Sequence, residues 1–274
     1  MVERFGRKRT RGCRLLGMSW TSYAYVSRRP EDSDLRQRIR QIAEEKRYFG
    51  CPRIYVRLRR QGWMMNYKKV ERIYGEEKLS LRRRKRKKCV SGLRLDIQRP
   101  TRAGQCYAMD FVHDRLATGR RFKVLTMVDP FTRECPALEV DTSINGLRVT
   151  QVLDRIFDSR PLPETIIVDN GPEFSGKVLD EWAFRKGVKL HFIQPGKPVQ
   201  NAFCESFNGK FRYEFLDAYW FLSLSEARQK CEAHRQEYNN EREHSSLNDL
   251  TPMEFIQQLK TTEQTTDNEQ KLQI

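Results

Sequence analysis

The middle of the chain alternates apolar and polar positions first with the period of strands and then with that of helices. Three apolar runs have strand character, near residues 105–112, 122–129 and 134–140. Farther along, helices are expected near 145–158, 174–186 and 201–216, and strands near 164–169 and 188–193. Three antiparallel strands followed by strand–helix alternation predict an α/β fold, a mixed sheet with helices on both faces.

Three short helical patterns precede this region and predict a small all-α domain at residues 31–81. The third pattern, from 66 to 78, has basic residues on its outer face: Lys68, Lys69 and Arg72. This arrangement favours a helix-turn-helix whose third helix lies in the major groove of DNA or along its backbone. A small bundle used for protein contact is the alternative. Residues 1–30, which come before it, are basic and predict a short helix, a turn and a second helix start.

Charge is divided unequally along the chain. Residues 1–100 hold 30 Lys+Arg and 10 Asp+Glu, whereas the other 174 residues hold 22 and 26, which gives net charges of +20 and −4. The densest run falls in an aperiodic linker at 82–104 and includes Arg82, Arg83, Arg84, Lys85 and Arg86. A basic segment ahead of a more acidic one is typical of a protein that holds a polyanion, so we expect DNA as the partner.

The C-terminal part, 217–260, is expected to be helical and to close the fold. Ser223 and Glu226 have the spacing of a capping box that opens a helix to about Asn240, and Pro252 suits the first turn of a last short helix. Arg242 lies between these helices and either helps to hold DNA or forms a structural turn, as does His244. Residues 261–274 are polar and aperiodic, which predicts a disordered tail.

Cysteine usage and hydropathy indicate the cellular compartment of the protein. The seven cysteines contain no C-x-x-C and do not pair with histidines at zinc-ligand spacing. Scattered thiols in an odd number fit a reducing compartment, and the chain has no signal peptide or apolar run of 18 residues. We therefore expect a cytoplasmic protein that is not associated with a membrane.

Three acidic residues stand out within the predicted α/β region. Asp110 lies in an apolar run of strand character, Asp169 follows ETIIV and precedes an Asn-Gly turn, and Glu205 is expected on the apolar side of a helix. Burying carboxylates together is costly unless cations lie between them. Two hard cations can activate the attacking oxygen and stabilise the leaving oxygen of a phosphodiester. The pattern indicates a two-metal nucleic-acid enzyme that uses two Mg²⁺ ions, with Mn²⁺ as a substitute.

Four phrases carry a resemblance to a known family: MDFVHDRLATGRRFKVLTMVDPFTRE, VDNGPEF, QPGKPVQNAFCESFNGKFR and YNNEREHSSLNDLTPMEF. They resemble the second-reading-frame (OrfB) transposases of bacterial insertion elements, which share a DDE catalytic core with retroviral integrases. The likeness covers about residues 30 to 258. It implies a ribonuclease-H-like core at 105–216, and it departs from the family at Cys106 and Tyr107, where Trp is common, and at Cys204, where small residues are common.

The resemblance implies roles for individual residues. Asp110, Asp169 and Glu205 correspond to the catalytic, metal-binding acids. Arg212 corresponds to a basic residue that grips DNA, and helical geometry places 205, 208 and 212 on one face. Other DNA contacts are expected from Asn208, Lys210 and Lys197. Asn170 and Gly171 would form the turn that presents Asp169, with Asn170 and Glu173 supporting the metal ligands from behind.

These observations predict a transposase that cleaves DNA at the ends of its element and joins the freed 3′ hydroxyl to another phosphodiester. Its expected partners are the terminal inverted repeats, target DNA, the first-frame (OrfA) product or a fusion with it, and further copies of itself on DNA. A non-catalytic regulator that binds element ends and a ribonuclease-H-type nuclease are the alternatives. Covalent catalysis by Tyr107 is not expected, because its strand position points it away from Asp110.

Overall fold

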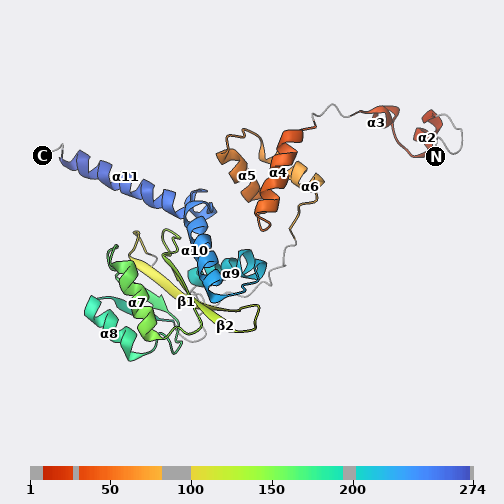
Figure 1. Cartoon of the computed structure of the whole chain (residues 1–274). Coiled ribbons are helices and arrows are strands. Elements are labelled where there is room, and N and C mark those ends of the chain that lie inside the picture. The colour runs from red at the N-terminus through yellow and green to blue at the C-terminus, as the bar shows by residue number, and fades with distance from the viewer. Residues whose placement is uncertain (1–8, 27–30, 82–99, 194–201, 272–274) are drawn as a thin grey trace. The chain divides into compact units, whose positions relative to one another are not determined.

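A computed structural model describes residues 9–26, 31–81, 100–193 and 202–271 (Figure 1). The chain divides into two compact units, Met1–Leu81 and Arg82–Ile274, and each is a structure in its own right. The arginine run Arg82–Arg86 and Lys197, all expected to contact DNA, lie outside the described residues.

The first unit is helical throughout its described residues. Its first segment holds the short helix α2 (Arg9–Leu15), a turn at Gly17 and the helix α3 (Trp20–Ala24), as the sequence predicts. The three expected helices follow as α4 (Ser33–Glu45), α5 (Cys51–Arg60) and α6 (Tyr67–Glu76). They pack around a core in which Ile39, Ile54 and Ile73 are fully buried. The Asn66 side chain caps α6 by accepting a hydrogen bond from the backbone N–H of Lys68.

The second unit is built on a five-stranded mixed sheet, which confirms the predicted fold class. Its strands, in chain order, are β1 (Cys106–Arg115), β2 (Arg121–Val128), β3 (Ala137–Asp141), β4 (Thr165–Val168) and β5 (Lys189–Phe192). Their spatial order is β3-β2-β1-β4-β5. The first three strands are antiparallel, whereas β4 runs parallel to β1 and to β5. The short β4 pairs with β1 only at Cys106–Ala108, which leaves the rest of that edge unpaired by any described strand.

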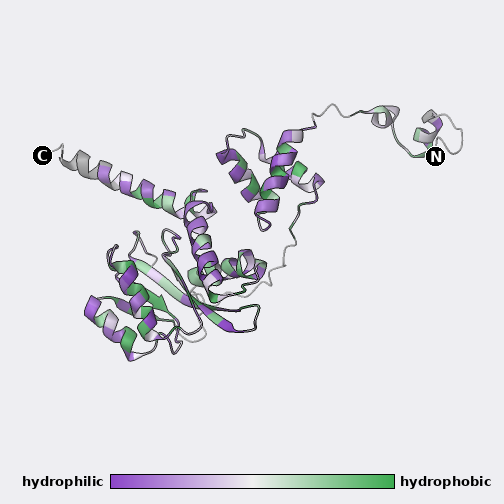
Figure 2. Ribbon diagram, in the orientation of Figure 1, coloured by the Kyte–Doolittle hydropathy of each residue, from purple (hydrophilic) through white to green (hydrophobic). Residues whose placement is uncertain are grey.

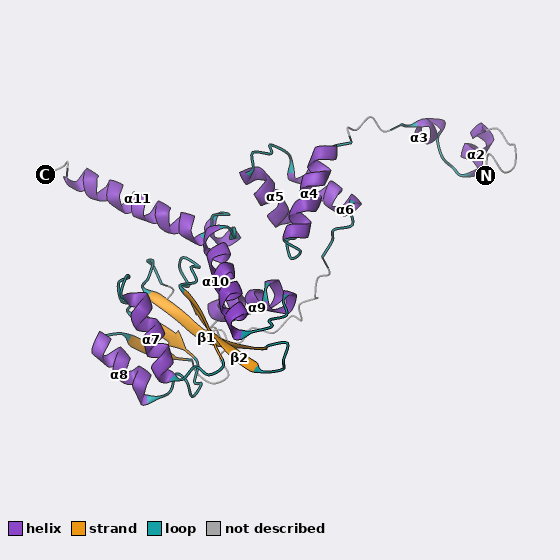
Figure 3. Cartoon of the chain, in the orientation of Figure 1, coloured by secondary structure: helices purple, strands orange, loops and turns teal. Residues whose placement is uncertain are grey.

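Helices cover both faces of this sheet, as expected (Figure 3). One face packs against α7 (Gly146–Phe157) and α8 (Lys177–Lys186), and the other packs against α9 (Ala202–Glu214) and α10 (Leu224–Asn240). Alternate residues of β1 supply the two cores: Met109 faces α7 and α8, and Val112 faces α9. Figure 2 shows the strands as mainly hydrophobic and α8 and α10 as mixed in polarity.

The C-terminal part is tied to α9 by a buried ion pair. Arg242 donates from Nε and a terminal nitrogen to the two carboxylate oxygens of Glu214, at 3.0 and 2.7 Å, and both side chains are less than a tenth exposed. His244 is buried beside Arg242 and packs edge-on against the ring of Tyr238. These contacts favour the structural role for Arg242 and His244 over DNA contact.

The end of the chain differs from expectation. In place of a short helix and a disordered tail, the single helix α11 extends over Pro252–Lys271. Thr251 and Glu254 cap it reciprocally, because each backbone N–H bonds the side chain of the other residue. The Gln, Glu and Lys of this stretch have good helix propensity, so a lack of apolar periodicity did not indicate a lack of helix. In the described part of the chain, no helix is long and apolar enough to cross a membrane.

Candidate active site

Asp110 lies on β1 two residues past the last residue that β4 pairs with. Its Oδ1 accepts a hydrogen bond from the backbone N–H of Phe111 at 2.7 Å, and its Oδ2 accepts one from the amide of Asn208 at 2.8 Å. Partial burial raises the pKa of this carboxyl, and the negative charges of Asp169 and Glu205 raise it further. The charges of the other two predicted acids therefore reach Asp110 at the open edge of β1.

Asp169 follows directly on β4 and is held by a tight turn. Its Oδ1 accepts a hydrogen bond from the backbone N–H of Gly171 at 2.9 Å. A Cβ at Gly171 would come within 2.9 Å of that same oxygen, so the turn requires glycine for space. The amide of Asn170 donates to the carbonyl of Ile193 at 2.7 Å and so joins the turn to the end of β5. The turn thus presents Asp169 beside the strand that carries Asp110.

Glu205 lies in the first turn of α9 and is exposed, whereas the sequence placed it on the apolar side of the helix. The buried line of α9 that faces β1 is formed instead by Cys204, Asn208 and, at its exposed end, Arg212. These residues contact Ala108, Asp110 and His113 in turn, so the helix runs along the strand in the same direction. Glu205 borders this line and keeps its carboxylate in solvent beside Asp110.

The donor set fits a hard divalent cation. All three groups are carboxylates, the ligands that Mg²⁺ prefers, and their mutual repulsion at Asp110 is what a cation relieves. The thiol of the neighbouring Cys204 is fully buried and lies 3.6 Å from the hydroxyl of Thr126 and 3.8 Å from the carbonyl oxygen of Ala108, so it faces the sheet and not the solvent. Within the described residues, no three His, Cys, Asp or Glu side chains are already drawn together as a metal cage.

Glu173, in the loop after Asp169, forms an ion pair with Lys123 of β2. The ammonium of Lys123 forms an ion pair with Glu173 and lowers the pKa of its carboxyl. The same ammonium lies 5.9 Å from the centre of the Phe111 ring, which stacks on Phe174 with centroids 4.9 Å apart. This cluster fixes the loop after Asp169 against β1 and β2.

Thr126 is the residue that sequence reasoning missed. It lies opposite Asp110 in the β1–β2 ladder and is fully buried. Its hydroxyl lies 2.9 Å from the side-chain oxygen of Asn208 and 3.1 Å from the carbonyl oxygen of Asp110. A single threonine within the apolar run KVLTMV was the available signal, because a buried hydroxyl needs a polar partner.

The predicted DNA-contacting residues are placed unequally. Arg212 is exposed and donates to the carbonyl of His113 at 2.6 Å, and Lys210 and Lys68 are also exposed. Asn208 is half-buried and engaged with Asp110. On α6, Lys69 and Arg72 both pair with the carboxylate of Asp32, and Arg72 also pairs with Glu76. Part of the basic outer face of α6 is therefore neutralised within its own unit.

Models of known families match residues 30–87 and 100–252 of the chain. Residues 30–87 match an HTH-like domain, and residues 100–198 and 186–252 match two models that are both described as an integrase core domain.

Several insertion-element proteins are similar along most of their length. The 31.7 kDa protein of insertion element IS407 from Burkholderia multivorans is 41% identical over 95% of this chain and 94% of its own. The 39.2 kDa protein of IS476 from Xanthomonas euvesicatoria is 37% identical over 95% of this chain and 76% of its own. A putative transposase of IS150 from Escherichia coli is 24% identical over 85% of this chain and 86% of its own.

Among solved structures, a simian T-cell lymphotropic virus intasome in complex with the PP2A regulatory subunit B56 gamma has a similar fold. The match has a TM-score of 0.53 and 13% identity, and it covers 79% of this chain and 73% of that one. At this identity the likeness concerns the fold, which is that of an integrase core.

Proposed function

This chain belongs to the family of insertion-element proteins that join an HTH-like domain to an integrase core domain, and on that premise we propose that it is a DNA transposase. The proposed reaction is metal-dependent cleavage of a DNA strand at the element end, followed by transfer of the freed 3′ hydroxyl to a new phosphodiester. The single observation that supports this proposal is that the charges of Asp169 and Glu205 both act on the carboxyl of Asp110, at the open edge of β1.

Each acid has a defined part in the proposal. Asp110, Asp169 and Glu205 would hold two Mg²⁺ ions, with Mn²⁺ as a substitute, and these supply activation of the attacking oxygen and stabilisation of the leaving one. Asn208 orients the Asp110 carboxylate through the 2.8 Å hydrogen bond. The turn of Asn170 and Gly171 orients Asp169, and the pair of Glu173 with Lys123 supports that turn. No covalent nucleophile is needed, since Tyr107 is buried against Phe157 on the opposite face of the sheet.

The remaining residues are proposed to hold DNA. Arg212 and Lys210 extend from the exposed side of α9 on the same helix as Glu205. In the helical unit, Lys68 is the member of the predicted basic face that is exposed, so it is the first candidate for contact with the terminal inverted repeat. The segments Arg82–Arg86 and Lys197 would add sequence-independent phosphate contacts. We further propose target DNA, the first-frame product and other copies of the chain as partners, in the bacterial nucleoid.

Replacement of the acids tests the proposal. Asp110→Asn, Asp169→Asn and Glu205→Gln should each abolish cleavage of a labelled element end in Mg²⁺ while leaving its binding nearly intact. Ser206→Ala is the matched control, because Ser206 is exposed on the same turn of α9. Substantial cleavage by one of the acid variants would remove that residue from the site.

The same assay separates the alternatives. Wild-type protein that binds element ends in Mg²⁺ and never cuts them would indicate a regulator. Cleavage confined to the RNA strand of an RNA/DNA hybrid would indicate a ribonuclease-H-type nuclease. Strand-transfer products that carry the element end joined to target DNA would support the transposase.

A further inference from the structure

A cavity of about 510 Å³ lies at the far end of the open edge of β1. Its lining is His113, Asp114, Arg115, Arg121 and Arg212. Three guanidinium groups thus share a cavity with one carboxylate. That carboxylate is already engaged, since the Oδ1 of Asp114 accepts the backbone N–H of Arg115 at 2.8 Å. Three positive charges and one negative charge give the lining a net charge of +2, so the cavity is electropositive.

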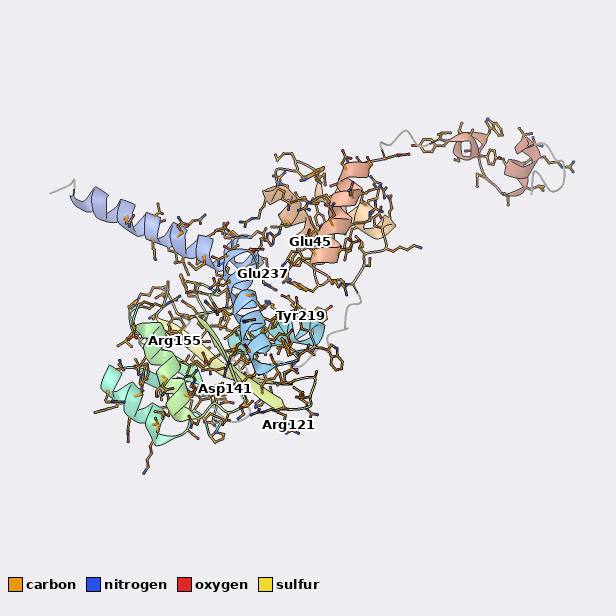
Figure 4. All side chains as sticks on the ribbon, in the orientation of Figure 1. Glu45, Arg121, Asp141, Arg155, Tyr219 and Glu237 are labelled. Atoms are coloured by element: carbon orange, nitrogen blue, oxygen red, sulfur yellow. The ribbon has the colours of Figure 1, made fainter. Side chains whose placement is uncertain are left out.

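Arg115 and Arg121 are direct partners in the β1–β2 ladder. Like charges placed opposite each other across two strands destabilise a sheet. Both side chains are exposed, and neither forms an ion pair with any residue that the structure describes. The hairpin therefore bears an unfavourable charge arrangement that a bound anion would relieve. Figure 4 labels Arg121 at this end of the hairpin.

The scaffold around the three arginines is held in place. The backbone N–H of Ala117, in the hairpin turn, donates to the carbonyl of Phe221 at 2.8 Å. The rings of Phe122 and Phe221 meet edge to face, 5.7 Å apart. On the other side, the bond of Arg212 to His113 fixes its guanidinium on the backbone of β1. A charged cavity with fixed walls is preorganised for binding.

The cavity lies on the same strand edge as the acids. Asp110 is three residues from His113 and five from Arg115, which at about 3.3 Å per strand residue corresponds to roughly 10–17 Å. On the scale of a DNA strand, whose axial rise is about 3.4 Å per nucleotide, this separation corresponds to a few nucleotides. Planar guanidinium groups match the oxygens of phosphate in geometry as well as charge.

From these observations we infer that Arg115, Arg121 and Arg212 form a phosphate-binding site for the DNA backbone, a few nucleotides from the bond that is cleaved. The inference rests on the proposed function, because the position of the cleaved bond is taken from the three acids. The site assigns a role to Arg115 and Arg121 of the hairpin, and it fixes the direction in which the DNA strand leaves the acids, along β1 toward its C-terminal end.

The test measures binding of the full chain to a fluorescent duplex that ends in the element's terminal inverted repeat. Arg115→Ala and Arg121→Ala should each weaken binding about tenfold and lower the slope of log K against log salt by about 0.9, the value for one phosphate contact. Arg120→Ala is the matched control, because Arg120 is exposed in the same hairpin but does not line the cavity. It should change Kd by less than about twofold. Equal losses for Arg120→Ala and Arg115→Ala would overturn the site.

A scan with methylphosphonates locates the contact, because each neutralises a single phosphate. Wild-type protein should lose affinity when one of the phosphates within a few nucleotides of the cleaved bond is neutralised. The Arg115→Ala/Arg121→Ala double variant should be insensitive to the same replacement, and equal sensitivity of both proteins would overturn the inference. The melting temperature of the double variant should equal or exceed that of wild type, since a repulsive pair is removed.

Cleavage distinguishes failure of the site from failure of the proposed function. Wild-type protein that shows the arginine-dependent scan but never cuts DNA in Mg²⁺ would refute the transposase and retain the phosphate site. Hairpin variants that bind and cut as wild type does would refute the phosphate site and retain the transposase.

Discussion

Asn208 donates a 2.8 Å hydrogen bond to the Oδ2 of Asp110, so α9 and β1 are joined at the carboxylate itself. The other end of the amide is 2.9 Å from the buried hydroxyl of Thr126 on β2. One side chain thus connects three elements, and the orientation of Asp110 depends on a residue of the helix that also carries Glu205.

Asn208→Leu, which keeps the branched shape and removes the amide, should lower the free energy of unfolding by about 1–3 kcal/mol, because the half-buried carboxylate and the Thr126 hydroxyl lose a partner. Cleavage should fall at least tenfold at saturating DNA. Asn208→Asp should be worse, since it places a further negative charge beside Asp110. Urea unfolding and single-turnover cleavage measure the two effects, and a Leu variant that cuts at the wild-type rate would contradict the orienting role.

Gly171→Ala should reduce cleavage at least tenfold while changing the melting temperature by only a few degrees. The added Cβ would lie 2.9 Å from an oxygen of Asp169, so the carboxylate must move. Gly176→Ala is the control, because its Cβ would meet only the carbonyl of Pro172 at 3.8 Å. Equal cleavage by both variants would show that the position of Asp169 is not critical.

Arg242→Met should destabilise the second unit by about 3–5 kcal/mol, because it leaves the buried carboxylate of Glu214 without its counter-charge. The double variant Glu214→Leu/Arg242→Met should recover much of that loss. Arg102→Met, which removes an exposed pair with Glu164, should cost less than about 1 kcal/mol. Urea unfolding measures all three, and an Arg242→Met cost no larger than that of Arg102→Met would refute the structural role.

Stability should fall as the pH rises above about 8.5, the ordinary pKa of a thiol. Burial raises the pKa of both Cys106 and Cys231 to about 12 in the folded protein, so the unfolded chain releases these protons first. Between the pKa of the unfolded chain and that of the folded protein, each thiol then lowers the free energy of unfolding by about 1.4 kcal/mol per pH unit. Urea unfolding from pH 7 to 10 should show the decline, and Cys231→Ala should reduce its slope. A slope unchanged by this substitution would contradict the assignment.

The sequence predicted elements whose periodicity is local. The strand of Asp110, the turn after Asp169 and the helix of Glu205 follow from short continuous runs of residues, and helical geometry alone placed Asn208 and Arg212 on the same side of α9. The prediction that Glu205 lies on the apolar side of this helix was wrong, because the residue is exposed. Periodicity marks the buried line of a helix, and it does not show whether a neighbouring position faces the sheet or the solvent.

The sequence alone could not predict contacts between residues that are far apart along the chain. Lys69 and Arg72 have the pattern of a DNA-binding face, yet Asp32 lies against both because α4 and α6 pack together. Thr126 reaches Asp110 only through the register of β1 and β2. The full length of α11 was missed because its second half has no apolar period.

The ion pair of Glu214 with Arg242 also sets an order of events during synthesis. The two residues are separated by 28 positions, so at about 5–20 residues per second the ribosome reaches Arg242 roughly one to six seconds after Glu214. Until Arg242 has been synthesised, Glu214 at the end of α9 lacks this ion pair, which joins the helix to the C-terminal part. A chain released early would hold Asp110 and Asp169 but no firmly seated Glu205. On the proposed function, the site would thereby become competent only after Arg242 has been synthesised, well after the three acids themselves.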